Sequence, residues 1–98
     1  MPQFEEELEL EVEIKEPSLY NVILHNDDYT SIEFVINILM SVFQKTNEEA
    51  HQIAVMIHEK GKGICGIYTF EIAQMKVHQV RELAKKNGYP LLATMEEK

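Results

Sequence analysis

The sequence predicts an α+β fold, in which three helices pack against a small three-stranded antiparallel sheet in the order β-α-α-β-α-β. The 98 residues suffice for one domain with one modest core. Apolar residues make up 45% of the chain, which is an ordinary fraction for a globular protein. Three short apolar runs suit strands, and three longer segments repeat their apolar residues with helical spacing.

Residues 1–17 are expected to form an acidic arm that precedes a core domain at residues 18–98. Seven Glu lie within the first 16 residues, and they alternate with apolar residues at Leu8, Leu10, Val12 and Ile14. This alternation is typical of a strand, but like charges on one face weaken a lone strand. We therefore expect a mobile arm that joins a sheet only where an edge is available.

The strands and helices of the core are predicted in chain order. Strands are expected at residues 19–24, 63–68 and 91–95, because these runs are apolar and bounded by turn residues. Thr30 with Glu33, and Thr46 with Glu49, have the spacing of a capping box and predict the starts of two helices. Thr69 can cap the third helix.

The composition indicates which classes of partner are improbable and in which compartment the protein is expected. Against 9 basic residues stand 17 acidic ones, and the net charge of −8 makes nucleic acid an improbable partner. Cys65 is the single cysteine, so no intramolecular disulfide can form. We see no signal peptide and no membrane-spanning run, and we expect a cytoplasmic protein with no membrane partner.

Three polar residues, Asn26, Asp27 and Asp28, stand between the first strand and the first helix. The commoner interpretation is a turn, because Asn and Asp side chains bond to nearby backbone groups. The alternative is a binding site for a cation. These side chains offer several acceptors, and an ammonium group forms strong charge-assisted hydrogen bonds with such acceptors.

No set of residues indicates catalysis or a metal site. His51 and His58 are too far apart for a compact pair of metal ligands, and Cys65 lies in a predicted strand where a free cysteine usually fills the core. Nothing assembles a nucleophile, a base and an oxyanion site. We therefore expect a binding module with no cofactor, rather than an enzyme.

Three blocks of this sequence resemble one family. The runs YNVILHNDDYTSIEFV, VMIHEKGKGICGIYTFEIAQMKV and YPLLATMEEK stand in the order found in ClpS, the adaptor that delivers N-degron substrates to a Clp AAA+ protease. The resemblance covers about residues 18–98. It implies two kinds of partner, N-degron proteins and the N-terminal domain of a Clp unfoldase of the ClpA or ClpC type. We expect the chain to act as a monomer.

The resemblance also implies which residues bind. The α-amino group of the substrate's first residue would be bound by Asn26, Asp27, Asp28 and His58. Its large apolar side chain, typically Leu, Phe, Tyr or Trp, would enter a pocket lined by Thr30, Ile32, Val35, Ala54, Ile57 and Leu91. The unfoldase would dock near Glu71 and Lys76 on the third helix. In the mechanism we expect, the ammonium lies against Asn26, Asp27 and the neutral ring of His58, while Asp28 adds negative potential or helix-start structure.

Two pocket positions depart from the family pattern. The family often has Met where this chain has Ile32 and Ala54. Ala54 removes several side-chain atoms and Ile32 is stiffer than Met, so we expect a roomier pocket that rejects Ile and Val less sharply. Two other functions remain open at this point. One is a docking domain of the same fold without an amine pocket, and the other is a small metal-dependent hydrolase.

Overall fold

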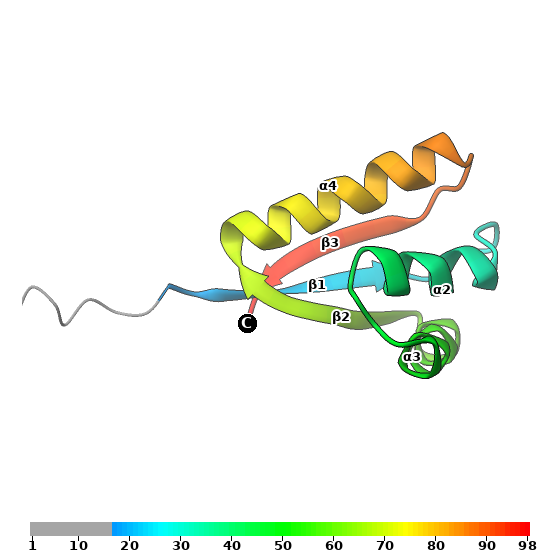
Figure 1. The fold of residues 1–98 in the computed structure, drawn as a ribbon, viewed down its shortest axis with the longest axis horizontal. Helices are drawn as coiled ribbons and strands as arrows, with labels where there is room; N and C mark the ends of the chain where they lie inside the picture. Colours follow the sequence, from blue (N-terminus) through cyan, green and yellow to red (C-terminus); the bar gives the residue numbers. More distant parts are fainter. Residues whose placement is uncertain (1–16) are drawn as a thin grey trace, which may run out of the picture.

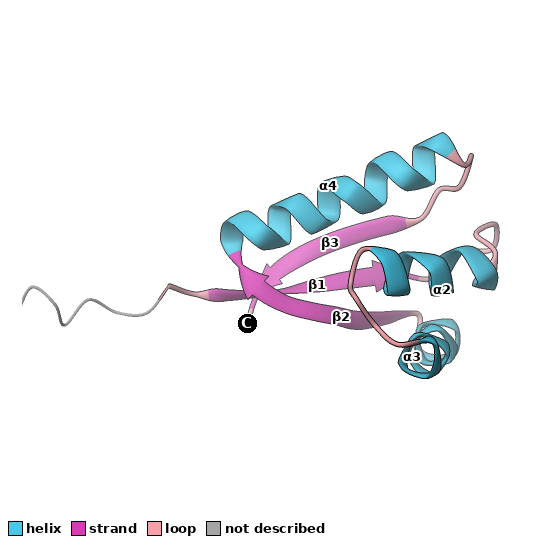
Figure 2. Cartoon of the chain, in the orientation of Figure 1, coloured by secondary structure: helices cyan, strands magenta, loops and turns pink. Residues whose placement is uncertain are grey.

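The structure is a computed structural model that describes residues 17–98, and it confirms the predicted fold class and element order (Figures 1 and 2). The arm expected at residues 1–17 lies outside the described residues, apart from Pro17. The elements are β1 (Leu19–His25), α2 (Ile32–Ser41), α3 (Asn47–Lys60), β2 (Lys62–Thr69), α4 (Phe70–Lys86) and β3 (Leu92–Glu97).

The sheet places β1 between β2 and β3, and β1 pairs antiparallel with both. Lys98 donates its backbone N–H to the carbonyl oxygen of Leu19 at 2.8 Å, so the start of β1 and the last residue lie at the same end of the sheet. His25 lies at the opposite end of β1 and leads directly into the Asn26 loop. The loop is thus separated from Leu19 and Lys98 by the length of the sheet (Figure 1).

The core lies on one face of the sheet, under the helices. Val22 and Leu24 point toward this face and are fully buried together with side chains of all three helices. Residues that point the other way along the edge strands, such as Ile64 and Leu92, are about half exposed. Alternation along a strand explains both sets, because successive side chains point to opposite faces.

The first helix begins one residue later than the sequence prediction, which was wrong about its cap. Ser31 is the N-cap of α2, and its hydroxyl accepts the backbone N–H of Phe34 at 3.2 Å. Thr30 instead donates its hydroxyl and its backbone N–H to the carboxylate of Asp27. Because Thr30 is hydrogen-bonded to Asp27, its side chain does not cap the helix, and the neighbouring Ser31 does so instead.

The second helix has the predicted capping box at its start and a glycine at its end. Thr46 accepts the N–H of Glu49 at 3.2 Å, and Glu49 accepts the N–H of Thr46 at 2.9 Å. Gly61 ends α3 in the left-handed region at φ 90°, which a residue with a Cβ adopts with difficulty. The carbonyl oxygen of Gly61 accepts the backbone N–H of Asn26 at 2.8 Å, which ties the loop after β1 to the end of α3.

Candidate functional site

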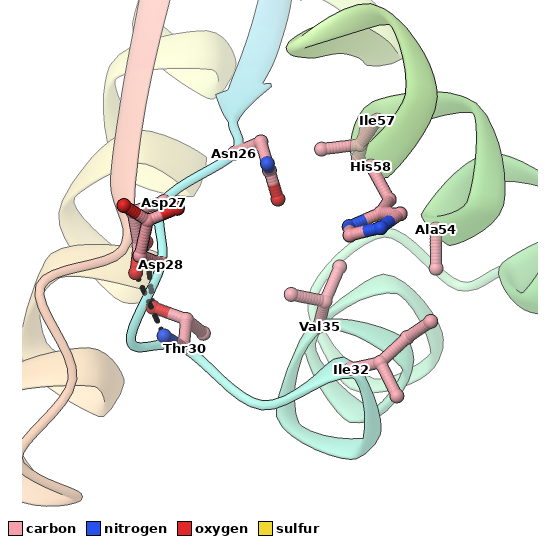
Figure 3. A pocket seen from close by; sticks show the side chains of 9 residues that line it. All are labelled: Asn26, Asp27, Asp28, Thr30, Ile32, Val35, Ala54, Ile57 and His58. Atoms are coloured by element: carbon pink, nitrogen blue, oxygen red, sulfur yellow. Dashed lines mark hydrogen bonds between the residues drawn. The ribbon is translucent and has the colours of Figure 1, made fainter.

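A cavity of about 390 Å³ opens where the loop after β1 meets the start of α2 and the second half of α3 (Figure 3). Nine residues line it: Asn26, Asp27, Asp28, Thr30, Ile32, Val35, Ala54, Ile57 and His58. The sequence analysis assigned all nine to one site, and the fold brings them together from three separate elements. Their roles in binding stay a prediction.

Asp27 holds the loop at the polar end of the cavity. Its Oδ1 accepts the backbone N–H groups of Tyr29 at 2.8 Å and Thr30 at 2.7 Å, and its Oδ2 accepts the Thr30 hydroxyl at 2.7 Å. Burial alone would raise the pKa of Asp27, but these hydrogen bonds outweigh it and lower the pKa below its ordinary value. The carboxylate is therefore ionised at neutral pH, and its hydrogen bonds to Tyr29 and Thr30 stabilise the loop.

Three other polar side chains of the cavity form no hydrogen bonds of this kind. Within residues 17–98, the side chains of Asn26, Asp28 and His58 form no hydrogen bond with another group of the protein. The amide of Asn26 and the ring of His58 point toward each other across the cavity (Figure 3). The cavity thus holds one amide oxygen, one carboxylate and one imidazole that can bind a ligand.

The other end of the cavity is apolar. Ala54 and Ile57 reach it from α3 and are each 2% exposed, and Val35 reaches it from α2 and is also buried. Ile32 is 46% exposed, so it lies at the mouth of the cavity and not within the core. An apolar side chain that entered here would bury both itself and part of Ile32.

Three predicted site residues lie outside this group. Leu91 is buried in the core and is not among the residues that line the cavity. Glu71 is exposed in the first turn of α4. Lys76 is half-buried, and its ammonium donates to the carbonyl oxygen of Val42 at 2.7 Å and to Oε1 of Gln44 at 3.3 Å. It therefore caps the C-terminal end of α2 with a positive charge.

The sequence analysis missed Ser31, which starts the helix that forms one wall of the cavity. A serine directly before an apolar helical run is a recognised start signal, and it was available here. The better match of Thr30 to a capping box concealed it. Lys76 was assigned to a docking surface, and its contact with the end of α2 carries no signal in the sequence.

The described residues contain no activated cysteine and no cluster of metal ligands. Burial raises the pKa of the Cys65 thiol to about 12, and its Sγ donates to the carbonyl oxygen of Gly63 at 3.6 Å. Across residues 17–98, no group of three or more His, Cys, Asp or Glu side chains could hold a metal ion. In the same part of the chain, no helix has both the length and the apolar character to cross a membrane.

Comparison with known proteins agrees with this geometry. Residues 15–94, most of the chain, match the family described as ATP-dependent Clp protease adaptor protein ClpS. The chain belongs to the ClpS family. As a ClpS-family protein it is an adaptor of the Clp protease and not an enzyme.

Named ClpS proteins from several bacteria are similar over nearly their whole length. A ClpS adapter of Nitratidesulfovibrio vulgaris is 52% identical over 91 residues, which cover 93% of this chain and 91% of that protein. A ClpS adapter of Shewanella pealeana is 54% identical over 88 residues, which cover 90% of this chain and 86% of that protein. The ClpS family assignment therefore rests on full-length likeness and not on a short motif.

A solved ClpS structure shares the fold. The structure of Agrobacterium tumefaciens ClpS2 bound to L-phenylalaninamide superposes with a TM-score of 0.82 at 34% sequence identity. The match covers 85% of this chain and 100% of that chain.

Proposed function

We propose that the cavity binds the first residue of substrate proteins that begin with a large apolar residue, and that the chain delivers these N-degron substrates to a Clp AAA+ unfoldase. One observation carries the proposal. Unoccupied acceptors on Asn26, Asp28 and His58 lie beside a buried apolar wall in one cavity. The ligand of the Agrobacterium protein, L-phenylalaninamide, combines a free α-amine with an apolar ring, which are the two features this cavity suits.

The α-ammonium would donate to Asn26, Asp28 and the unprotonated nitrogen of His58. An ammonium carries three N–H donors, and these residues supply an amide oxygen, a carboxylate and a ring nitrogen. Asp27 would add its negative charge to this contact, as expected from the sequence, and it also positions its neighbours. Its oxygens accept three hydrogen bonds from the loop, while a carboxylate offers about four acceptor sites.

The first side chain would lie against Val35, Ala54 and Ile57, with Ile32 at the mouth. Leu, Phe, Tyr and Trp side chains each bury enough apolar surface to favour binding there. Leu91 is left out of the proposed lining because the core already buries it.

Delivery requires a docking surface for the unfoldase. We propose that the N-terminal domain of a ClpA- or ClpC-type unfoldase docks on α4 near Glu71, in the cytoplasm, with one adaptor chain acting alone. The exposure of Glu71 supports this assignment. Lys76 is partly exposed and would lie beside the docked domain, while its ammonium stays bound to the end of α2.

The test is fluorescence anisotropy with a labelled peptide that begins with Leu. Micromolar or tighter binding that is lost when the peptide is N-acetylated, and lost again in Asp28→Ala, is the expected result. Acetylation removes the positive charge and two of the three N–H donors that the acceptors of Asn26, Asp28 and His58 would bind, and it adds bulk at the amine. Equal or absent binding of the free peptide, of the acetylated peptide and by Asp28→Ala would contradict the proposal that the cavity binds an amine.

Ala54→Met tests the size of the apolar pocket. Methionine would fill the space beside Ile57, so we expect the variant to reject peptides that begin with Ile or Val more sharply than the wild type does. The difference should be about tenfold, because one or two methylene groups in a pocket are worth about 1–3 kcal/mol. Near-equal rejection by the two proteins would show that Ala54 does not set the preference.

A further inference from the structure

Tyr89 is held rigidly at the end of α4. The backbone N–H of Tyr89 donates to the carbonyl oxygen of Ala84 at 2.9 Å, and the N–H of Gly88 donates to that of Lys85 at 3.2 Å. Gly88 has φ 76°, in the left-handed region. This pair of hydrogen bonds around a left-handed glycine is a Schellman motif, which fixes the direction in which the chain leaves a helix. The position of Tyr89 is thus set by the backbone of α4.

The side chain of Tyr89 contacts the start of α2 in two ways. Its hydroxyl oxygen accepts the Ser31 hydroxyl at 3.2 Å, and its ring centroid lies 4.6 Å from that of Phe34 with the planes tilted by 37°. Ser31 is the N-cap, and its oxygen also accepts the backbone N–H of Phe34. Tyr89 therefore contacts both the cap residue and the first apolar turn of α2.

The segment that Tyr89 holds contains one wall of the cavity. Thr30 and Ile32 flank Ser31, and Val35 follows Phe34. On the other side, Asp27 fixes Thr30 through its hydroxyl and its backbone N–H. The segment from Thr30 to Val35 is thus held from the loop by Asp27 and from α4 by Tyr89.

We propose that Tyr89, which does not line the cavity, is a positioning residue of the ligand pocket that sets the distance between its apolar wall on α2 and its polar groups. The proposal rests on the proposed function, because it concerns the same ligand. A wall that shifts between positions contacts the first side chain less well, so the pocket loses both affinity and discrimination by size. The ammonium contacts proposed for Asn26, Asp28 and His58 lie outside the segment from Thr30 to Val35 that Tyr89 holds.

Two substitutions separate the two contacts of Tyr89. Tyr89→Phe removes only the hydroxyl that accepts from Ser31, while Tyr89→Leu also removes the ring beside Phe34. Tyr20→Leu is the matched control, because Tyr20 forms the other aromatic pair of the described chain, with Phe70 at 5.3 Å, near the start of α4. Each Leu variant thus loses one ring of an aromatic pair, but only the pair of Tyr89 includes a residue of the helix of the pocket wall.

The experiment measures anisotropy titrations with two peptides, one beginning with Leu and one with Val, and with the acetylated Leu peptide. Thermal unfolding establishes that each variant is folded at the assay temperature. We expect Tyr89→Phe to weaken Leu-peptide binding about three- to fivefold, as expected for one hydrogen bond, and Tyr89→Leu about tenfold. The ratio of Leu to Val affinity should fall at least twofold in Tyr89→Leu and stay unchanged in Tyr20→Leu.

The affinity ratio distinguishes positioning from general stability. A variant that is merely less stable lowers the fraction of folded protein, which reduces both affinities equally and leaves their ratio unchanged. Wild-type affinity and ratio in both Tyr89 variants would overturn the inference while the proposed function stood. An equal loss for both peptides, or the same shift in Tyr20→Leu, would overturn it as well. Failure of the wild type to bind the free Leu peptide would overturn the proposed function itself.

Discussion

At the scale of single residues, the adjacent acids Asp27 and Asp28 do different work. The carboxylate of Asp27 is surrounded by donors from its own loop, whereas that of Asp28 is exposed and accepts no hydrogen bond from residues 17–98. Two identical side chains one residue apart thus differ in their hydrogen bonds within the fold. The difference is a matter of local geometry, because the donors of Tyr29 and Thr30 converge on Asp27 alone.

Asp27→Ala should lower the free energy of unfolding by about 1–2 kcal/mol at pH 7, because two backbone N–H groups and one hydroxyl lose their acceptor. Asp28→Ala should change it by less than about 0.5 kcal/mol, as exposed substitutions usually do. Urea unfolding followed by circular dichroism measures both. Equal losses would contradict the division of roles between the two acids.

The pH dependence of the stability lost in Asp27→Ala follows from the lowered pKa of Asp27. A carboxyl group whose pKa is lower in the folded state stabilises the fold above its unfolded pKa, about 3.9, and this stabilisation is lost as the pH falls further. The gap in stability between the wild type and Asp27→Ala should therefore be constant near neutrality and should narrow below about pH 4. A gap that widened in acid would show that the carboxylate is not the stabilising form.

Cys65 should be inert in the folded protein. Burial raises the pKa of its thiol to about 12, so almost none of the reactive thiolate is present at pH 8. A thiol reagent such as 5,5′-dithiobis(2-nitrobenzoate) should react with it slowly in the native protein and rapidly in denaturant. Fast reaction of the native protein would mean that the strand β2 opens readily.

At the scale of elements, the site depends on how the helices begin and end. The helix α3 carries Ala54, Ile57 and His58 near its end, and both of its ends are fixed by local hydrogen bonds, at Thr46 and at Gly61. The helix α2 is held at its start by Ser31 and at its end by the ammonium of Lys76. Two facing helices with fixed ends give a cavity whose walls keep their separation.

Thr46→Ala should lower the free energy of unfolding by about 1 kcal/mol, since it removes the hydroxyl that accepts the backbone N–H of Glu49 while the backbone N–H of residue 46 can still donate to Glu49. Thr69→Ala is the natural comparison. Thr69 is also an N-cap, but its side chain forms no capping hydrogen bond, so its loss should cost only a few tenths of a kcal/mol. Thr46→Ala should therefore unfold at a clearly lower temperature than Thr69→Ala. If they unfolded at the same temperature, the capping box would contribute nothing.

At the scale of the whole molecule, one face of the sheet carries the core, and the open face exposes residues of the edge strands while Ile23 on the central strand is buried. Ile38 on α2 is 2% exposed and packs in the core, while Ile64 on β2 points away from it and is 48% exposed. Ile38→Ala should therefore lower the free energy of unfolding by about 2–4 kcal/mol, and Ile64→Ala by less than about 1 kcal/mol. Denaturant unfolding measures the difference. Similar losses would indicate that the open face is covered in solution.

Much of this arrangement was predictable from the sequence, and the exceptions share a cause. The capping box of Thr46 and the strand alternation depend on neighbours in the chain, so periodicity and spacing were sufficient to predict them. The sequence offers both Thr30 and Ser31 as N-cap residues, and the hydrogen bond from the Thr30 hydroxyl to Asp27, which decides between them, is seen only in the structure. The contact of Lys76 with Val42 joins residues 34 positions apart and depends on tertiary packing.

The placement of Lys98 has a practical consequence for handling this protein. Leu19 and Lys98 are hydrogen-bonded at one end of the sheet, and β1 runs for seven residues from Leu19 to His25, directly before the loop that opens the cavity. At about 3.3 Å per residue, this spacing is roughly 20 Å. A dye, an affinity tag or a sensor surface attached through Lys98 would thus face away from the pocket, and immobilised protein would present its cavity to the solution.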